Sequence, residues 1–152
     1  MGRKWTYSLM VEAVRYSLFA VTCDGTTKER TESNEMKSSI LFTKSKAFAL
    51  RIVRLYKHLR ERKESVIAKQ MLRSGTSIGA NIAESRYAQS KTDFASKLQI
   101  ALKEAAETEY WLELLRDSEL VESSPAFDSL CGDCTEIIKL LTASVKTAKE
   151  SV

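Results

Sequence analysis

The sequence predicts an all-α protein with the fold of an antiparallel up-down four-helix bundle. Its 152 residues include one proline and five glycines, too few for a chain of short strands and turns. Apolar residues recur at helical spacing in four segments, at about residues 45–62, 66–88, 91–117 and 125–148. The connections between them are short, so successive helices are antiparallel neighbours in one domain over residues 43–150.

Residues 1–42 are expected to lie outside this bundle as an N-terminal extension. Residues 23–40 are polar and unpatterned, which indicates a linker or disorder. The first residues resemble a signal peptide, but Glu12 and Arg15 interrupt the apolar run and no cleavage site follows cleanly. The odd count of three cysteines indicates no disulfide framework, and no run of about 18 uncharged apolar residues exists. We therefore expect a cytoplasmic protein without a membrane span.

The first helical segment combines a core stripe with a basic flank. The stripe consists of Phe48, Ile52, Leu55 and Leu59. Seven candidate nucleic-acid-binding residues lie on this segment and the next: Arg51, Arg54, Lys57, His58, Arg62, Arg73 and Arg86. Arginine suits bidentate phosphate contacts, whereas few aromatic residues are interleaved for base stacking. The alternative interpretation is an ordinary solvated helix face.

The second segment carries poor helix formers in its middle, in the stretch LRSGTSIGANIAES. Its predicted core face consists of Ile67, Met71, Ser74, Ile78 and Ile82. Gly75, Gly79 and Ala83 are spaced by four, so they share one side and allow another helix to approach closely. Ser77 and Asn81 fall on the boundary of the core face, where they would need hydrogen-bond partners across the bundle.

The third and fourth segments begin with recognisable capping residues. Ser90 with Asp93 resembles a capping box, and Ser124 precedes Pro125 at a first helical position. The predicted inner face of the third segment is Phe94, Leu98, Ala101, Ala105, Thr108 and Leu112. That of the fourth is Phe127, Cys131, Cys134, Ile138, Leu141 and Val145.

A second apolar set on the third segment points away from this inner face. It consists of Ile100, Trp111 and Leu114, with Glu107 among them. In a monomeric bundle these side chains would face water, and such a patch often marks a protein interface. We predict an oligomer interface there; contact with the N-terminal segment is the alternative.

No residue pattern indicates an enzyme or a metal site. Cys131 and Cys134 have CxxC spacing, but without a second ligand pair they are read as core residues. Glu84, Glu104, Glu107 and Glu109 invite comparison with carboxylate-bridged di-iron bundles, which also require Glu-x-x-His motifs. The single histidine, His58, has no glutamate three residues before it. We expect no cofactor.

Three stretches together resemble one protein family. They are FALRIVRLYKHL, KQMLRSGTSIGANIAESRYAQS and DFASKLQIALKEAAETEYWLELL. Over about residues 36–150 they resemble the bacterial four helix bundle protein family. That family includes proteins encoded in intervening sequences of large-subunit rRNA genes and the accessory protein of diversity-generating retroelements, which works with a reverse transcriptase.

The resemblance implies an antiparallel four-helix bundle that assembles as a homopentameric ring. It leaves the biochemical function open, with nucleic-acid binding through basic surface as the leading idea. The sequence lacks the proline often found near Gly79 and the glycine near Ser85 in this family. The 35 residues before Met36 have no family counterpart that we recognise.

These observations favour a non-enzymatic, homo-oligomeric bundle that binds structured RNA or duplex DNA through basic surface. The net charge of +4 permits such binding without establishing it. Residues 1–35 hold five basic and five acidic residues, so the excess positive charge lies in residues 36–152. The alternative is a protein-interaction scaffold that docks a partner such as a reverse transcriptase, and a small enzyme is a distant third class.

Overall fold

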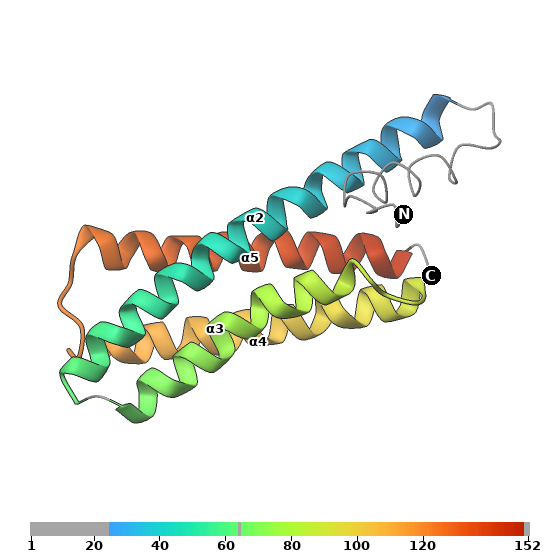
Figure 1. The fold of residues 1–152 in the computed structure, drawn as a ribbon. Helices are drawn as coiled ribbons and strands as arrows, with labels where there is room; N and C mark the ends of the chain where they lie inside the picture. Colours follow the sequence, from blue (N-terminus) through green and yellow to red (C-terminus); the bar gives the residue numbers. More distant parts are fainter. Residues whose placement is uncertain (1–24, 64, 151–152) are drawn as a thin grey trace, which may run out of the picture. The chain divides into compact units, whose positions relative to one another are not determined.

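The structure, a computed structural model, describes residues 25–63 and 65–150, which form four α-helices and the turns between them. These are α2 (Gly25–Glu61), α3 (Ser65–Ser85), α4 (Lys91–Asp117) and α5 (Pro125–Glu150), shown in Figure 1. The predicted all-α bundle is therefore confirmed. The signal-peptide question concerns residues 1–24, which lie outside the described residues.

Helix α2 begins twenty residues earlier than the apolar pattern predicts. It starts at Gly25, so residues 25–40, which the sequence pattern indicated as linker or disorder, are helical in the structure. The segment lacks an apolar stripe, but it contains neither proline nor glycine after Gly25. An established helix gains one hydrogen bond for each residue added, so it can extend through a polar stretch that contains no proline. The core begins at Leu41, which is buried within the unit Met36–Val152.

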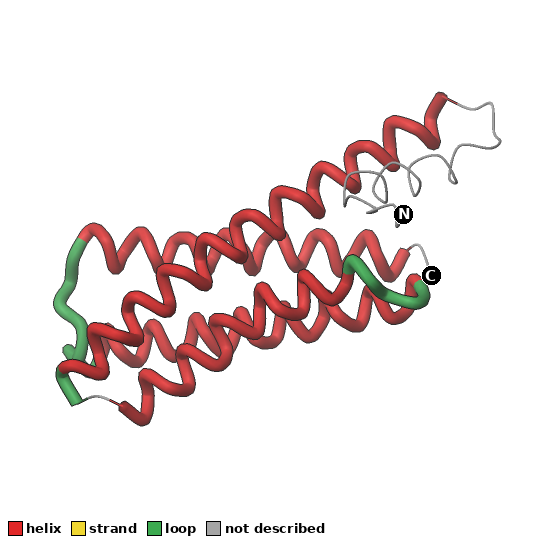
Figure 2. The backbone as a smooth tube through the Cα atoms, viewed as in Figure 1, coloured by secondary structure: helices red, strands yellow, loops and turns green. Residues whose placement is uncertain are grey.

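The helices of this unit pack in chain order, and the last one closes on the first. Helix α2 meets α3 where Ile52 faces Gly75, and it meets α5 where Arg51 binds Asp133. On the opposite side, α4 contacts both α3 and α5. Figure 2 shows that the α2–α3 and α4–α5 connections lie at one end of the bundle and the α3–α4 loop at the other. The end of α2 and the start of α5 are thereby brought together.

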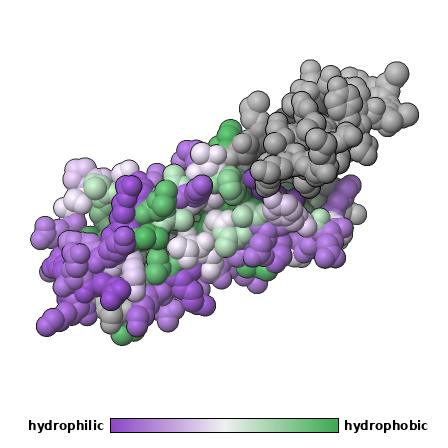
Figure 3. Space-filling view, in the orientation of Figure 1, coloured by the Kyte–Doolittle hydropathy of each residue, from purple (hydrophilic) through white to green (hydrophobic). Residues whose placement is uncertain are grey.

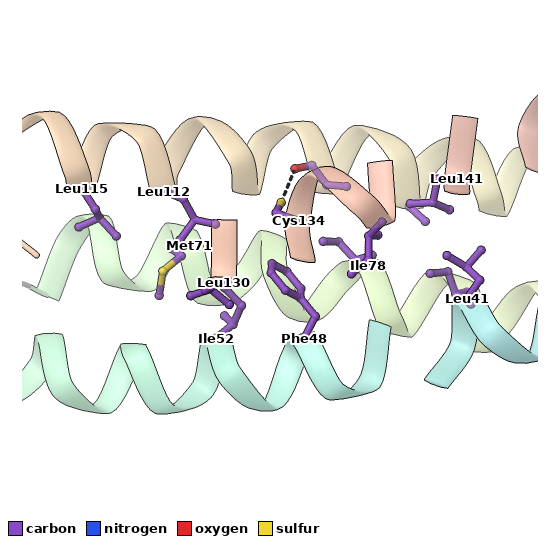
Figure 4. Packing of buried hydrophobic residues seen from close by; sticks show 14 of the residues in the cluster. Leu41, Phe48, Ile52, Met71, Ile78, Leu112, Leu115, Leu130, Cys134 and Leu141 are labelled. Carbon is purple, nitrogen blue, oxygen red and sulfur yellow. Dashed lines mark hydrogen bonds between the residues drawn. The ribbon is translucent and has the colours of Figure 1, made fainter. Parts of the chain in front are cut away.

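The core is apolar and continuous along the bundle (Figure 4). Most predicted inner residues are buried, including Phe48, Met71 and Leu112. On α5, Leu130 and Ile137 are buried although they were not predicted. The predicted Cys131 and Ile138, one residue further along, are only half-buried. Leu55, Ile67 and Phe94 likewise pack at the margin of the core.

The glycines of α3 lie on the side that faces α2. A β-carbon on Gly75 would lie 2.9 Å from Cγ2 of Ile52, and one on Gly79 would lie 3.7 Å from the backbone oxygen of Ser45. The predicted close approach is confirmed, and it is tighter at Gly75. Glycine has no β-carbon, so the two helices can approach this closely, at the cost of lower helix propensity in α3.

The polar residues of α3 are satisfied mostly within their own helix. Asn81 Nδ2 donates to the backbone oxygen of Ser77 at 2.9 Å, so the expected partner across the bundle is wrong for Asn81. One hydrogen bond between α3 and α4 does cross the core, and it joins the hydroxyl groups of Thr108 and Ser74 at 2.9 Å. Short side chains reach their own preceding turn more readily than a neighbouring helix.

Both predicted N-caps are confirmed. Ser90 Oγ accepts the Asp93 N–H at 3.1 Å, and Ser124 Oγ accepts the Phe127 N–H at 3.3 Å. The Asp93 carboxylate accepts the N–H of Gln89, one residue before the position that a capping box uses. Capping of this kind satisfies backbone donors that a helix start leaves without partners.

Candidate nucleic-acid interface

A surface hollow of about 400 Å³ lies where the end of α2 meets the start of α5. Figure 3 shows mainly hydrophilic side chains over this end of the molecule, with hydrophobic surface between them. The hollow is lined from α2 by Arg51, Arg54, Leu55, His58 and Arg62, and from the opposite side by Val121, Glu122, Ser124, Ala126, Phe127 and Leu130.

The basic lining follows from helical spacing on α2. Residues 51, 54, 58 and 62 are separated by three or four, so their side chains share one face. That face lies beside the core stripe, because Leu55 packs partly against the core and also lines the hollow. The sequence prediction that these four basic side chains form one strip agrees with this geometry.

The opposite wall is built by the turn after α4. Glu119 takes the left-handed conformation at φ 57°, which ends the helix and redirects the chain. The N–H of Val121 then donates to the Leu115 oxygen at 3.4 Å, which holds Val121 at the hollow. Ser124 caps α5 from the same wall, and Phe127 follows one turn later on the buried side.

Arg51 is occupied by α5. Its guanidinium forms an ion pair with Asp133, donates to Ser129 Oγ at 3.2 Å and donates to the Ala126 oxygen at 2.7 Å. Its side chain is only 29% exposed. Three acceptors on one helix use most of the donor fork of an arginine. Arg51 thus ties α2 to α5 and forms a side of the hollow.

Arg54, His58 and Arg62 are exposed and free of such ties. Among the residues that the structure describes, no side-chain hydrogen bond or ion pair holds any of the three. Lys57 is exposed as well but does not line the hollow. A row of uncommitted basic side chains on one helix face can meet phosphates without first breaking other contacts.

The remaining two predicted residues lie elsewhere. Arg73 pairs with Glu107 of α4 at 2.9 Å. Arg86 stacks over the Phe42 ring, with its guanidinium carbon 5.0 Å from the ring centroid. The structure therefore brings together four of the seven predicted residues at the hollow and separates Arg73 and Arg86 from them.

The second apolar set on α4 is partly exposed, as its spacing predicts. Ile100 is 40% exposed, and Trp111 and Leu114 are half-buried. Trp111 Nε1 donates to the Glu107 carboxylate at 3.2 Å, so the indole is held in place. Tyr110 is 56% exposed and packs edge-on against Trp111. The sequence prediction of this surface did not include Tyr110. Its position next to Trp111 in the sequence was the one signal that could have indicated it.

Comparison with known proteins identifies the family. A family model described as the 23S rRNA-intervening sequence protein matches residues 37–143. This chain belongs to the 23S rRNA-intervening sequence protein family. The family predicted from the three quoted stretches is thereby confirmed.

A solved structure supports the same assignment. The chain is similar to a protein of unknown function from the S23 ribosomal protein family of Bacteroides thetaiotaomicron VPI-5482, with 56% sequence identity. The match covers 72% of this chain and 98% of that chain, with a TM-score of 0.69. No curated protein matches the chain.

The CxxC cysteines of this intervening-sequence family member are packed on α5. Cys134 is fully buried and its thiol donates to the Ala105 oxygen at 3.6 Å, as Figure 4 shows. Burial raises the pKa of Cys134 to about 12 and also raises the pKa of the half-buried Cys131. A protonated thiol is a poor nucleophile and metal ligand. The geometry therefore supports the core-packing interpretation of these residues.

The four glutamates that suggested a comparison with di-iron bundles do not converge. Glu84 pairs with Lys97 and Glu107 with Arg73, whereas Glu109 accepts from the Thr135 hydroxyl on the side of α5. Glu104 Oε2 is buried without a hydrogen-bond partner among the described residues. Within the described ranges, no group of three or more His, Cys, Asp or Glu residues could hold a metal ion.

None of the four described helices is both long enough and apolar enough to cross a membrane.

Proposed function

We propose that this protein is a non-enzymatic, homo-oligomeric bundle that binds nucleic acid, as structured RNA or duplex DNA, through the basic side of the hollow. The observation that carries the proposal is the row of Arg54, His58 and Arg62, exposed and uncommitted along one face of α2. The guanidinium group of arginine matches the geometry of phosphate oxygens. A row of such side chains along one helix face can contact successive phosphates of a nucleic-acid strand. The excess positive charge in residues 36–152 adds a favourable long-range field.

The family adds support on the kind of partner. Its description names an intervening sequence of 23S rRNA, so RNA is the first nucleic acid that we propose as a partner. A-form helices are recognised largely through phosphate and sugar contacts. A short basic row needs no base-specific groups for that purpose. We place this activity in the cytoplasm, where rRNA is present.

Self-association would strengthen a weak site. The partly exposed apolar set of α4, which includes Ile100 and Trp111, is the surface that we assign to contacts between copies. The resemblance suggests a pentameric ring, and a ring repeats the basic row once per subunit. Several weak phosphate contacts then combine through effective concentration.

The salt dependence of binding tests the proposal. Fluorescence anisotropy of a labelled RNA hairpin should show binding at low salt. Affinity should fall linearly on a log–log plot between about 50 and about 200 mM salt, because bound phosphates release counterions. If no binding occurs at the lowest salt, the nucleic-acid proposal is wrong.

A second candidate function is a scaffold that docks a protein such as a reverse transcriptase. The observation that favours it is the exposure of Tyr110 beside Trp111, because aromatic side chains are common at the centres of protein interfaces. The affinity of a protein partner for such an apolar surface would change little over the same range of salt concentration. The same titration, repeated with a candidate protein partner, therefore separates the two functions.

A further inference from the structure

The hollow between α2 and the start of α5 has two chemically different parts. Its margin carries Arg54, His58 and Arg62, all of them exposed. Its interior is apolar: Leu55 and Val121 are half-buried, and Phe127 and Leu130 are 5% and 4% exposed. Contacts with the backbone of a duplex would use the margin alone. A ligand that fills the hollow would therefore have to be partly apolar to match this interior.

We propose that the hollow accepts the base of one unpaired nucleotide, while the arginines at its margin hold the adjoining phosphates. This inference rests on the proposed nucleic-acid function and names the element that is recognised. A volume of about 400 Å³ is at the lower end of the range for small-ligand pockets and suits a single nucleotide. Sequence-specific RNA recognition commonly uses bases that are splayed out from loops and bulges.

The polar groups of the hollow suit the edge of a base. Glu122 lines it, is exposed, and makes no ion pair among the described residues. A carboxylate only accepts hydrogen bonds, and in nucleic-acid complexes it pairs with amino groups such as that of cytosine. The same carboxylate repels a phosphate, so phosphates belong on the arginine side. The hollow should therefore prefer bases that carry an amino group over uracil.

Three RNAs that share one stem test this proposal. The first is a blunt duplex, the second has a single bulged cytidine, and the third has an abasic residue at the bulge. The abasic bulge keeps the extra phosphate and the flexibility of the backbone and removes only the base. Anisotropy titrations of the parent protein should give roughly tenfold tighter binding to the cytidine bulge than to the other two RNAs.

A protein variant whose side chain fills the hollow tests the same proposal from the other side. Val121→Trp places a large side chain in the hollow, and Val66→Trp makes the same change at a residue that is 75% exposed and outside it. Val121→Trp should lose the preference for the bulge and keep the affinity for the blunt duplex, whereas Val66→Trp should keep both. Circular dichroism checks that both variants are folded. If a variant does not fold, the comparison of the three RNAs with the parent protein still tests the proposal.

The outcomes separate this inference from the proposed function. Equal affinity for all three RNAs overturns the base pocket and leaves phosphate binding intact. Equal affinity for the abasic and cytidine bulges shows recognition of the bent backbone, which also overturns it. A parent protein that binds none of the RNAs overturns both proposals.

Discussion

Ile52 of α2 packs directly on Gly75 of α3, where a β-carbon would lie 2.9 Å from the isoleucine Cγ2 atom. Ile52 is fully buried, so it has no room to move aside. Gly75→Ala should therefore lower the free energy of unfolding by about 1–3 kcal/mol, because overpacking exceeds the gain in helix propensity. Urea denaturation measures the change, and an unaltered midpoint would show that the two helices can separate freely.

The matched substitution at Gly79 should change the free energy of unfolding in the opposite direction. A β-carbon there would lie 3.7 Å from the Ser45 oxygen, which is an ordinary contact. Gly79→Ala should raise stability by up to about 1 kcal/mol through helix propensity. Gly79→Leu should destabilise the protein, because a larger side chain would press on the backbone of α2. A loss of stability with alanine would mean that the helices pack more tightly here than the structure shows.

Arg51 and Arg54 should behave differently although both line the hollow. Arg51→Gln removes the ties to Asp133, Ser129 and Ala126, so it should lower stability by about 1–2 kcal/mol. Arg54→Gln should leave the urea midpoint unchanged, because no described contact holds that side chain. Equal midpoints for the two variants would contradict the structural role of Arg51.

The cysteines of α5 should be protected in a pH-dependent way. Burial raises the pKa of Cys134 from 9.0 to about 12, so its thiol stays protonated at pH 8 and should resist alkylation in the native protein. Once unfolded, the thiol ionises near pH 9 while the native thiol does not. Cys134 therefore contributes a loss of stability as the pH rises from 9 towards 12. Mass spectrometry after alkylation at pH 8 checks the first point, and rapid native labelling of Cys134 would refute it.

Trp111→Glu should weaken the assembly and leave the helices intact. The substitution places a charge beside Glu107 within the surface assigned to contacts between copies. Light scattering should report a smaller species with an unchanged circular dichroism spectrum. Tyr87→Glu is the control, because Tyr87 is 84% exposed and lies outside this surface. A Trp111 variant of parental mass would place the contact on another face.

The periodic part of the fold was predictable from the sequence, and the part without an apolar pattern was not. The stripe of Phe48, Ile52 and Leu59 and the caps at Ser90 and Ser124 predicted elements that the structure contains. The first twenty residues of α2 were missed because the apolar pattern starts only with the core. Propagation from an established helix can extend it without an apolar pattern.

The basic row of the candidate site was also predictable, and its opposite wall was not. Arg54, His58 and Arg62 are close in sequence, so helical spacing alone places them together. Val121 and Glu122 lie about sixty residues away, and they reach the hollow through the turn at Glu119 and the contact between α2 and α5. Spacing within one helix also could not predict that Arg51 would form an ion pair with α5.

The central claim is that this row, and not the net charge, binds nucleic acid. Two double variants with the same loss of two positive charges test it: Arg54→Gln with Arg62→Gln, and Lys139→Gln with Lys146→Gln at exposed positions further along α5. The measurement is the affinity of each variant for one structured RNA at low salt. We expect the arginine pair to lose most of the binding, with a shallower salt slope, and the lysine pair to stay near the parent. Equal losses in the two variants would contradict the claim.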